Sequence, residues 1–354
     1  PELSKEISRL HNLQMAKKIQ LNSAYGALAN PYFRWFDTRH AEAITMSGQL
    51  SIRWIEKDIN AYLNKVLETK NVDYVVASDT DSIYVTLAGL VNKFFAKDQQ
   101  IEKKQKIISF LDKSCEAQIQ SVINKSYSNL AEYVGAYQQK MFMKREVIAD
   151  KGIWRGKKMY VLNIWYNEEV RYKEAKLKTM GIEVVRSSIP SVCREAMKKA
   201  LNIIMLGTQQ ELFDFVKDFQ NKFMAMPVED IASPRGVNGM TKYHDASNIF
   251  KDRTPIHVKG ALIHNHLIRQ LDLEKKYTFI NNGDKIKFIY LKEPNVAHAS
   301  VISFTGVLPP QFNLDKFIDR KLQFEKTFLG PVKSITDVIG WETKKTANLK
   351  GFRK

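Results

Sequence analysis

An apolar, β-branched stretch with two carboxylates at its centre constrains this chain more than any other feature. The segment YVVASDTDSIYV, residues 74–85, has Val, Ile and Tyr on either side of a polar group of Ser, Asp and Thr. This pattern is typical of two strands joined by a tight turn. It predicts a hairpin whose tip presents Asp79 and Asp81.

The spacing of these two aspartates suggests a shared ligand. Side chains two residues apart in a strand or tight hairpin project to the same face, so Asp79 and Asp81 could be aimed at one point. Two close carboxylates repel each other unless a cation lies between them, and oxygen ligands suit Mg²⁺ better than a soft metal. The alternative is an Asp-rich turn whose acids bond only to their own backbone. The apolar strands on both sides weaken this alternative, because ordinary turns of this kind are not usually framed by such strands.

Charge and composition define the broad class of the protein. The 354 residues are 44% hydrophobic and include 55 Lys and Arg against 38 Asp and Glu, a net charge of +17. Such a globular, basic chain attracts polyanions, nucleic acid first, although a basic structural protein would show the same balance. Cys115 and Cys193 are too isolated for a zinc site or a disulfide framework, which fits a reducing, cytosolic compartment. No apolar run approaches the roughly 20 residues of a membrane span, so no membrane partner is expected.

The order of patterns along the chain predicts an α+β fold. Apolar residues recur at helical spacing over residues 3–29, 39–69, 95–135 and 190–225. The segments KMFMKREVIAD (140–150) and KKMYVLNIWYN (157–167) are interpreted as a second strand pair, with KGIWRG (151–156) as the turn between them. A change of pattern places a domain boundary near residue 180.

The DTDSIYV segment resembles the palm hairpin of family B DNA polymerases, and the surrounding sequence most resembles the replicative enzymes of T-even phages. The resemblance implies that Asp81 is a direct metal ligand, with Asp79 as its companion. It also implies two Mg²⁺ ions as cofactor, which activate the primer 3′ hydroxyl and stabilise the leaving pyrophosphate. Thr80 and Ser82 would support the site. Ala77 and Ser78 precede the motif here, where the family has Tyr-Gly, and the resemblance places these two positions beside the primer end. Reverse transcriptases fit less well because their paired acids usually adjoin each other.

The segment KKIQLNSAYGALAN resembles the nucleotide-facing fingers helix of the same family. Lys18, Asn22 and Tyr25 follow at spacings of four and three residues and so share one helix face. Without the resemblance, a surface helix with an aromatic anchor explains the pattern better than a functional site does. By the resemblance, Lys18 would hold triphosphate oxygens, Asn22 would support them and Tyr25 would lie by the minor groove of the nascent base pair. Ser23 and Gly26 would be supporting residues.

Several later segments resemble the parts of the family that hold duplex DNA. GKKMYVLNIW is similar to the KKRY-type segment, with Met in place of its arginine, and KLKTMGIEVVRSSIP is similar to the junction of palm and thumb. Glu146 would be a supporting palm residue, although Lys144 stands where the family has an aspartate. An edge strand or a solvated face is the alternative for each segment. The predicted DNA-binding residues are Lys157, Lys158, Tyr160, Lys178, Arg186, Lys242, Tyr243, His257 and Lys259.

The resemblance implies three parts: a second fingers helix over residues 1–30, the C-terminal portion of the palm over 31–180, and a mostly helical thumb over 181–354. The chain starts at Pro1 without Met, and no D-x-x-S-L-Y-P-S segment, which carries the family's other metal-binding aspartate, and no exonuclease motif is found. We therefore expect a fragment or one subunit of a split polymerase, inactive without an N-terminal chain that carries the exonuclease and the remaining palm. The competing hypothesis is a non-catalytic module that binds primer–template duplex.

The remaining partners also follow from the resemblance. Primer–template DNA and dNTPs would be the substrates, in the host cell cytoplasm if the protein is phage-encoded. A sliding clamp is a further hypothesis, because the tail TANLKGFRK keeps Leu349 and Phe352 of the family's apolar clamp-binding peptide and little else.

Overall fold

The computed structural model describes residues 2–96, 102–182, 186–245 and 247–343. Its elements combine helices with small antiparallel sheets, which confirms the predicted α+β class. Contacts divide the chain into two compact units: an N-terminal unit of residues 1–148 and 166–170, and a C-terminal unit of residues 149–165 and 171–354. None of the helices in the described ranges combines the length and the apolar character that crossing a bilayer requires.

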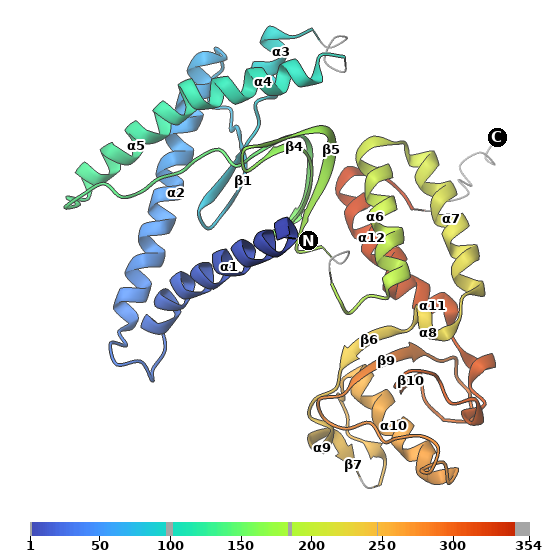
Figure 1. The fold of residues 1–354 in the computed structure, drawn as a ribbon. Helices are drawn as coiled ribbons and strands as arrows, with labels where there is room; N and C mark the ends of the chain where they lie inside the picture. The colour runs from blue at the N-terminus through green and yellow to red at the C-terminus, as the bar shows by residue number, and fades with distance from the viewer. Residues whose placement is uncertain (1, 97–101, 183–185, 246, 344–354) are drawn as a thin grey trace, which may run out of the picture. The chain divides into compact units, whose positions relative to one another are not determined.

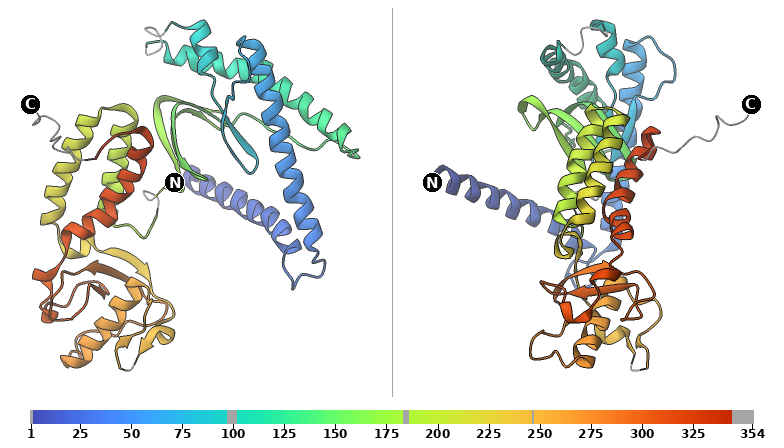
Figure 2. Two further views of the ribbon diagram at one scale, coloured as in Figure 1. Left: turned by 180° about the vertical axis from the view of Figure 1, so that it is seen from behind. Right: turned by 90° about the vertical axis from the view of Figure 1, so that its right-hand side faces the viewer.

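The N-terminal unit is built mainly from helices, close to the ranges that periodicity predicts. Asp37 caps α2, because its carboxylate accepts the backbone N–H of Arg39 at 2.9 Å. In Figure 2, α1 runs outward from its junction with α2. The predicted third helix is divided into several pieces, with a π-helical turn over Cys115–Ile119. The helices are α1 (Glu2–Leu28), α2 (Thr38–Val66), α3 (Ala88–Phe94), α4 (Lys104–Ser114) and α5 (Gln120–Tyr133).

The core of this unit lies where α5 crosses α2 (Figure 1). Ile55, Ile59 and Leu63 recur every four residues on α2 and are at most 1% exposed. They share one cluster with three buried residues of α5 and with the partly buried Ile83 and Val85 that follow Asp81 in the chain. The helices therefore give the acidic hairpin a rigid apolar base. The α5 members of the cluster are Ile123, Tyr127 and Leu130.

The predicted hairpin is confirmed as β1 (Val75–Asp79) and β2 (Ser82–Val85), an antiparallel pair. Its entry is tied to α2 through Asn60, whose side chain accepts the Tyr74 N–H at 2.8 Å and donates to Asp73 Oδ1 at 2.8 Å. Polar contacts at one end and apolar packing along its length thus fix the hairpin against α2.

A three-stranded sheet follows in the order β3–β4–β5, with β3 (Val147–Gly156), β4 (Met159–Asn167) and β5 (Val170–Met180). The prediction that KGIWRG forms a turn is wrong, because residues 151–156 belong to β3 and the chain reverses at Lys157 and Lys158. Gly152 serves packing instead: a Cβ there would lie 2.6 Å from the Trp154 ring. The contact division falls inside this sheet rather than after residue 180, and the predicted fingers, palm and thumb ranges stay predictions.

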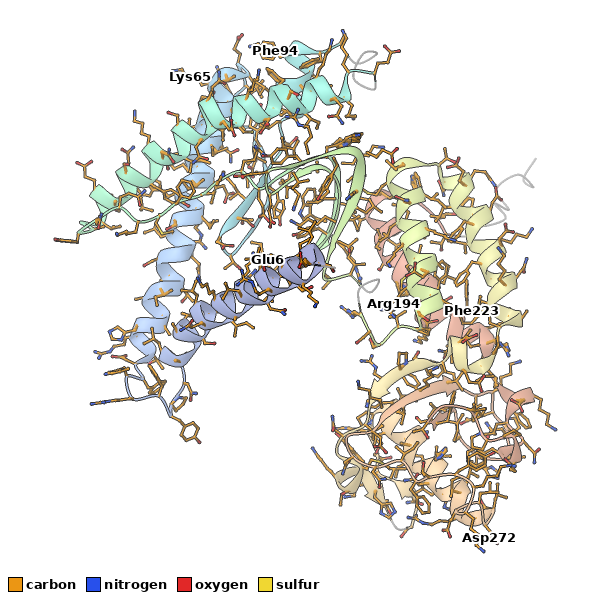
Figure 3. The ribbon with its side chains drawn as sticks, viewed as in Figure 1. Glu6, Lys65, Phe94, Arg194, Phe223 and Asp272 are labelled. Carbon is orange, nitrogen blue, oxygen red and sulfur yellow. The ribbon has the colours of Figure 1, made fainter. Side chains whose placement is uncertain are left out.

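The helical part of the C-terminal unit contains a cluster of phenylalanines. Phe223, labelled in Figure 3, is 0% exposed, and its ring centroid lies 5.2 Å from that of Phe324 and 6.0 Å from that of Phe219. A capping box of Thr208 and Glu211 starts α7. The elements are α6 (Ser191–Leu206), α7 (Gln209–Ala225), α8 (Val228–Ile231), α11 (Arg320–Phe324), the π-helical turn Glu325–Leu329, α12 (Gly330–Thr336) and the 3₁₀ turn Asp337–Ile339.

A second three-stranded sheet adds β structure to the region predicted as mostly helical. Its order is β10–β9–β6, and α10 packs on β10 so closely that a Cβ at Gly260 would lie 2.5 Å from Ser303 Oγ. The elements are β6 (Ser233–Gly236), α9 (Met240–Tyr243), β7 (His244–Asp245), β8 (Ile249–Phe250), α10 (Ile256–Gln270), β9 (Lys285–Tyr290), β10 (Val301–Phe304) and the 3₁₀ turns Pro310–Phe312 and Asp315–Phe317.

His264 on α10 is a buried titratable group in this part of the core. It is 2% exposed, and neither ring nitrogen makes a hydrogen bond of good geometry to a described residue. Burial lowers the pKa of His264 from 6.5 to about 4, an effect that backbone groups of Thr278 and Ser303 partly oppose. The unfolded chain therefore binds a proton in a pH range where the folded chain does not.

We expect this difference to make the C-terminal unit acid-sensitive. Stability should be full above about pH 6.5 and fall as the pH drops toward 4, by on the order of 3 kcal/mol in all. Urea unfolding at a series of pH values measures how steeply the free energy of unfolding depends on pH. His264→Phe should make this dependence flatter. His266→Phe, on the exposed side of the same helix, is the control. If the pH dependence of the free energy of unfolding is unchanged in His264→Phe, His264 is not the cause of the acid sensitivity.

Candidate active site and nucleic-acid interface

The tip of the β1–β2 hairpin carries the two predicted metal ligands. Asp79 ends β1 opposite Ser82, and Thr80 and Asp81 form the two-residue connection. Asp81 therefore lies in the turn of the hairpin rather than in a strand, and the prediction that the two carboxylates point to one ligand stays a prediction. Asp79 is half-buried and Asp81 is exposed.

Short-range hydrogen bonds hold this tip together. The backbone N–H of Asp81 donates to the Asp79 carbonyl at 2.7 Å, and Ser82 Oγ donates to the same carbonyl at 3.1 Å. Thr80 Oγ1 donates to Asp79 Oδ1 at 3.0 Å. The two residues predicted to support the acids thus contact Asp79 directly, one at its backbone and one at its carboxylate.

The donor chemistry of the tip fits Mg²⁺, because carboxylate oxygens are the ligands that this ion prefers. The number of donors is small: within the described ranges, no group of three or more His, Cys, Asp or Glu side chains could hold a metal ion. Asp79 and Asp81 would hold such an ion through carboxylate oxygens, and water, phosphate or other ligands would have to supply the rest.

Tyr127 on α5 is a neighbour of the tip that sequence reasoning missed. It is 4% exposed. Burial raises the pKa of its phenol, and the negative charge of Asp81 raises it further. The carboxylate of Asp81 therefore lies within electrostatic reach of α5. No local sequence signal marks this pair, because Tyr127 is 46 residues further along the chain.

The predicted nucleotide-binding residues all lie on α1. Lys18, Asn22 and Tyr25 share one face, as their spacing predicts, and all three are exposed. Ser23 Oγ donates to the carbonyl of Ile19 at 2.7 Å, and a Cβ at Gly26 would meet no atom within 4 Å. No described side chain of α1 is buried. This helix face is therefore open to a ligand.

The reversal between β3 and β4 presents Lys157 and Lys158, both exposed. Lys158 adopts a φ of 59°, and Gly181, with a φ of 65°, approaches it so closely that a Cβ on Gly181 would lie 2.1 Å from the Lys158 carbonyl oxygen. Tyr160, predicted as a DNA contact, is only 6% exposed, and its ring centroid lies 6.5 Å from that of Trp154. In this structure Tyr160 belongs to the packed interior rather than to a DNA-facing surface.

Because of this close approach, we expect Gly181→Ala to displace the Lys157–Lys158 turn. The added methyl group would collide with the backbone, and alanine would be strained in the left-handed conformation. Together these effects should lower the free energy of unfolding by about 1–3 kcal/mol. Hydrogen exchange of residues 156–160 should rise, and fluorescence anisotropy should show weaker binding of duplex DNA. Gly156→Ala is a matched control, because a Cβ there would meet no atom within 4 Å. Equal behaviour of the two variants would contradict the role given to Gly181.

The other predicted residues near the sheet are dispersed. Lys178 is half-buried on β5, and Arg186 is exposed with Nη2 at 3.5 Å from the Gly181 carbonyl. Glu146 is exposed just before β3, and its carbonyl accepts the Glu168 N–H at 2.9 Å. Lys144, where the resemblance has an acid, forms an ion pair with Glu169. Lys144 thus puts a positive charge where the resemblance has an aspartate.

Four of the predicted DNA-binding residues lie on α9 and α10, Lys242 and Tyr243 on the first and His257 and Lys259 on the second. Lys259 Nζ lies 4.6 Å from the Phe250 ring centroid, and Lys242 Nζ lies 5.4 Å from that of Tyr243. The strand pair β7–β8 and helix α9 join them, since the Lys251 N–H donates to the Tyr243 carbonyl at 2.9 Å. We call Lys242, Tyr243, Phe250, His257 and Lys259 the basic–aromatic cluster.

Arg235 was missed by sequence reasoning. Burial lowers the pKa of His257, and the positive charge of Arg235 lowers it further, so Arg235 on β6 is a neighbour of the basic–aromatic cluster. Its sequence context, SPRGV, carries no pattern that distinguishes it from other surface arginines. Leu349 and Phe352, on which the clamp hypothesis depends, lie outside the described residues.

Comparison with known proteins shows which proteins the chain is similar to. No family model matches the chain. It is 30% identical to the DNA-directed DNA polymerase of Enterobacteria phage T4, over 98% of this chain and 39% of the phage protein. It is 32% identical to that of Escherichia phage RB69, over 95% of this chain and 38% of that protein. A DNA polymerase of Pyrococcus glycovorans is 28% identical over 59% of this chain and 22% of its own length.

The matches to the phage proteins cover nearly all of this chain but only a part of each relative. The chain spans about two-fifths of the length of the phage relatives, and the similarity covers nearly all of its own residues, the acidic hairpin included. The chain is therefore a relative of the family B DNA polymerases and corresponds to a part of them.

Proposed function

We propose that this chain is the C-terminal part of a DNA-directed DNA polymerase and takes part in template-directed transfer of nucleotides from dNTPs to a primer 3′ end. The single observation that carries the proposal is the β1–β2 tip, where Asp79 and Asp81 stand on an apolar base. The similarity to phage DNA-directed DNA polymerases supports the same reaction.

Each group of residues has a part in this proposal. Two Mg²⁺ ions, when bound, would activate the primer hydroxyl and stabilise the leaving pyrophosphate. Asp81 and Asp79 would hold them through carboxylate oxygens. Lys18 would pair with triphosphate oxygens, and Asn22 and Tyr25 would position the nucleotide from the same exposed face of α1. The Lys157–Lys158 turn and the basic–aromatic cluster would contact phosphates of the duplex, which orient it without reading its sequence.

We further propose that the metal site is completed by another polypeptide segment. Two carboxylates offer fewer anionic ligands than a two-metal site needs, and the described residues provide no larger group. A separate N-terminal chain that carries the exonuclease and the remaining palm would supply the missing aspartate. This chain alone would then have little or no activity, and the reassembled enzyme would act in the host cytoplasm.

Reconstitution tests this proposal. The chain is mixed with the upstream portion of the same polymerase, and primer extension is measured with Mg²⁺ and dNTPs. We expect extension only when both chains are present. Extension by this chain alone would contradict the need for a partner, and no extension by any mixture would contradict the proposed reaction.

A non-catalytic module that binds primer–template duplex is the second candidate. The exposed lysines of the β3–β4 reversal and the basic–aromatic cluster favour it, because neither requires a metal. In this case duplex binding would be robust and its affinity would fall steeply with salt, while every mixture would lack extension. The same reconstitution therefore distinguishes the two functions.

A further inference from the structure

Thr80 adopts a backbone conformation that is unusual for its residue type. Its φ is 56°, in the left-handed region, where β-branched residues are outliers. The hydrogen bond from the Asp81 N–H to the Asp79 carbonyl, at 2.7 Å, closes a three-residue γ-turn with Thr80 at its centre. The positive-φ form of this turn is rare and strained.

A glycine would fit this position without strain. Glycine adopts positive φ readily, and it is the usual first residue of a two-residue hairpin connection that needs positive φ at that residue. Thr80 is exposed, so its side chain gains no burial that would offset the strain. Strain that packing does not explain is a reason to look for a function at that residue.

The Thr80 side chain makes one specific contact that points to such a function. Its hydroxyl donates to Asp79 Oδ1 at 3.0 Å, which limits rotation of the carboxylate. The γ-turn fixes the backbone angle between Asp79 and Asp81 at the same time. Thr80 thus restrains Asp79 through its side chain and Asp81 through its backbone.

We propose that Thr80 is a positioning residue, whose strained turn and hydroxyl hold the carboxylates of Asp79 and Asp81 ready for a divalent cation. This inference rests on the proposed function in so far as the two acids hold Mg²⁺. Loss of the restraint would leave both acids in place but mobile, and a mobile ligand pair binds a cation less tightly.

The test compares substitutions at Thr80 by two measurements on this chain reassembled with the upstream portion of the polymerase. Mn²⁺ replaces Mg²⁺ and is titrated by electron paramagnetic resonance, and thermal unfolding is measured on the same samples. We expect Thr80→Gly to raise the unfolding temperature, because it removes strain, and to weaken Mn²⁺ binding by about three- to tenfold, the range that one lost hydrogen bond implies. A merely structural residue would not move the two measurements in opposite directions.

Two further variants separate the hydroxyl from the backbone. Thr80→Val keeps the branched shape and removes the hydroxyl, so Mn²⁺ binding should also weaken by several-fold. Thr80→Ser keeps the hydroxyl and should stay within about twofold of the parent chain. Asn71→Gly is the matched control, because Asn71 has the same φ of 56° on an exposed loop of the same unit and should leave Mn²⁺ binding unchanged.

The outcomes distinguish this inference from the function on which it rests. If Asp81→Asn weakens Mn²⁺ binding but Thr80→Gly and Thr80→Val do not, the role of Thr80 is overturned and the metal site stands. If Asp81→Asn leaves Mn²⁺ binding unchanged, both the metal site and the role of Thr80 are overturned.

Discussion

Asp81→Asn should reduce primer extension by the reassembled polymerase by about a thousandfold or more. Asparagine has nearly the same shape as aspartate but lacks the negative charge that would bind a divalent cation. Metal ions stabilise transition-state charge by several kcal/mol, and each 1.4 kcal/mol corresponds to a factor of ten in rate. Single-turnover extension at saturating DNA and dNTP measures the chemical step itself.

Two measurements make this result specific to the metal site. Because Asp81 is exposed, its replacement should leave urea unfolding and duplex binding close to those of the parent chain. Glu132→Gln, which removes an exposed charge at the end of α5, should leave the extension rate unchanged. Extension by Asp81→Asn within tenfold of the parent enzyme would rule out Asp81 as a metal ligand.

Phe223→Ala should destabilise the C-terminal unit by about 3–5 kcal/mol, the usual result of removing a buried ring. The side chain is 0% exposed and lies among the rings of Phe219 and Phe324, so the cavity cannot be filled by a simple shift of one neighbour. Urea unfolding gives the free energy, and hydrogen exchange of α7 assigns the transition to this unit.

Phe142→Ala provides the comparison for the lost ring. Phe142 is 73% exposed, so its truncation should change the free energy of unfolding by no more than about 0.5 kcal/mol. Similar losses in the two variants would mean that the phenylalanine cluster does not carry the stability of the C-terminal unit.

Local patterns predicted the parts of the fold that local interactions determine. The hairpin at residues 75–85 and the helices α1 and α2 follow from residue spacing within one segment. By contrast, β5 was missed because charged residues interrupt its alternation, and KGIWRG was misread because Gly152 makes room for the Trp154 ring rather than for a turn. The sheet β10–β9–β6 depends on pairing of Ser233–Gly236 with residues about fifty positions later, which no short window detects.

For the candidate site, too, some features could be predicted from the sequence and others could not. The residue types and spacing at Asp79 and Asp81 pointed to a cation, and the family resemblance supplied the roles of Lys18 and Tyr25. What the sequence could not predict was how these groups are held: the γ-turn at Thr80, the approach of Tyr127 to Asp81, and the burial of Tyr160. Each depends on a backbone angle or on a contact between segments distant in the chain.

The absence of buried side chains on α1 has a consequence for how a nucleotide would meet it. A helix that buries no side chain lacks the packing of an apolar face, from which most helical stability in proteins comes. Its amides should therefore exchange with solvent far faster than those of α2, whose apolar stripe is buried. Part of the binding free energy of any ligand at Lys18 and Tyr25 would then be spent on ordering the helix, so that affinity and helix formation would rise together.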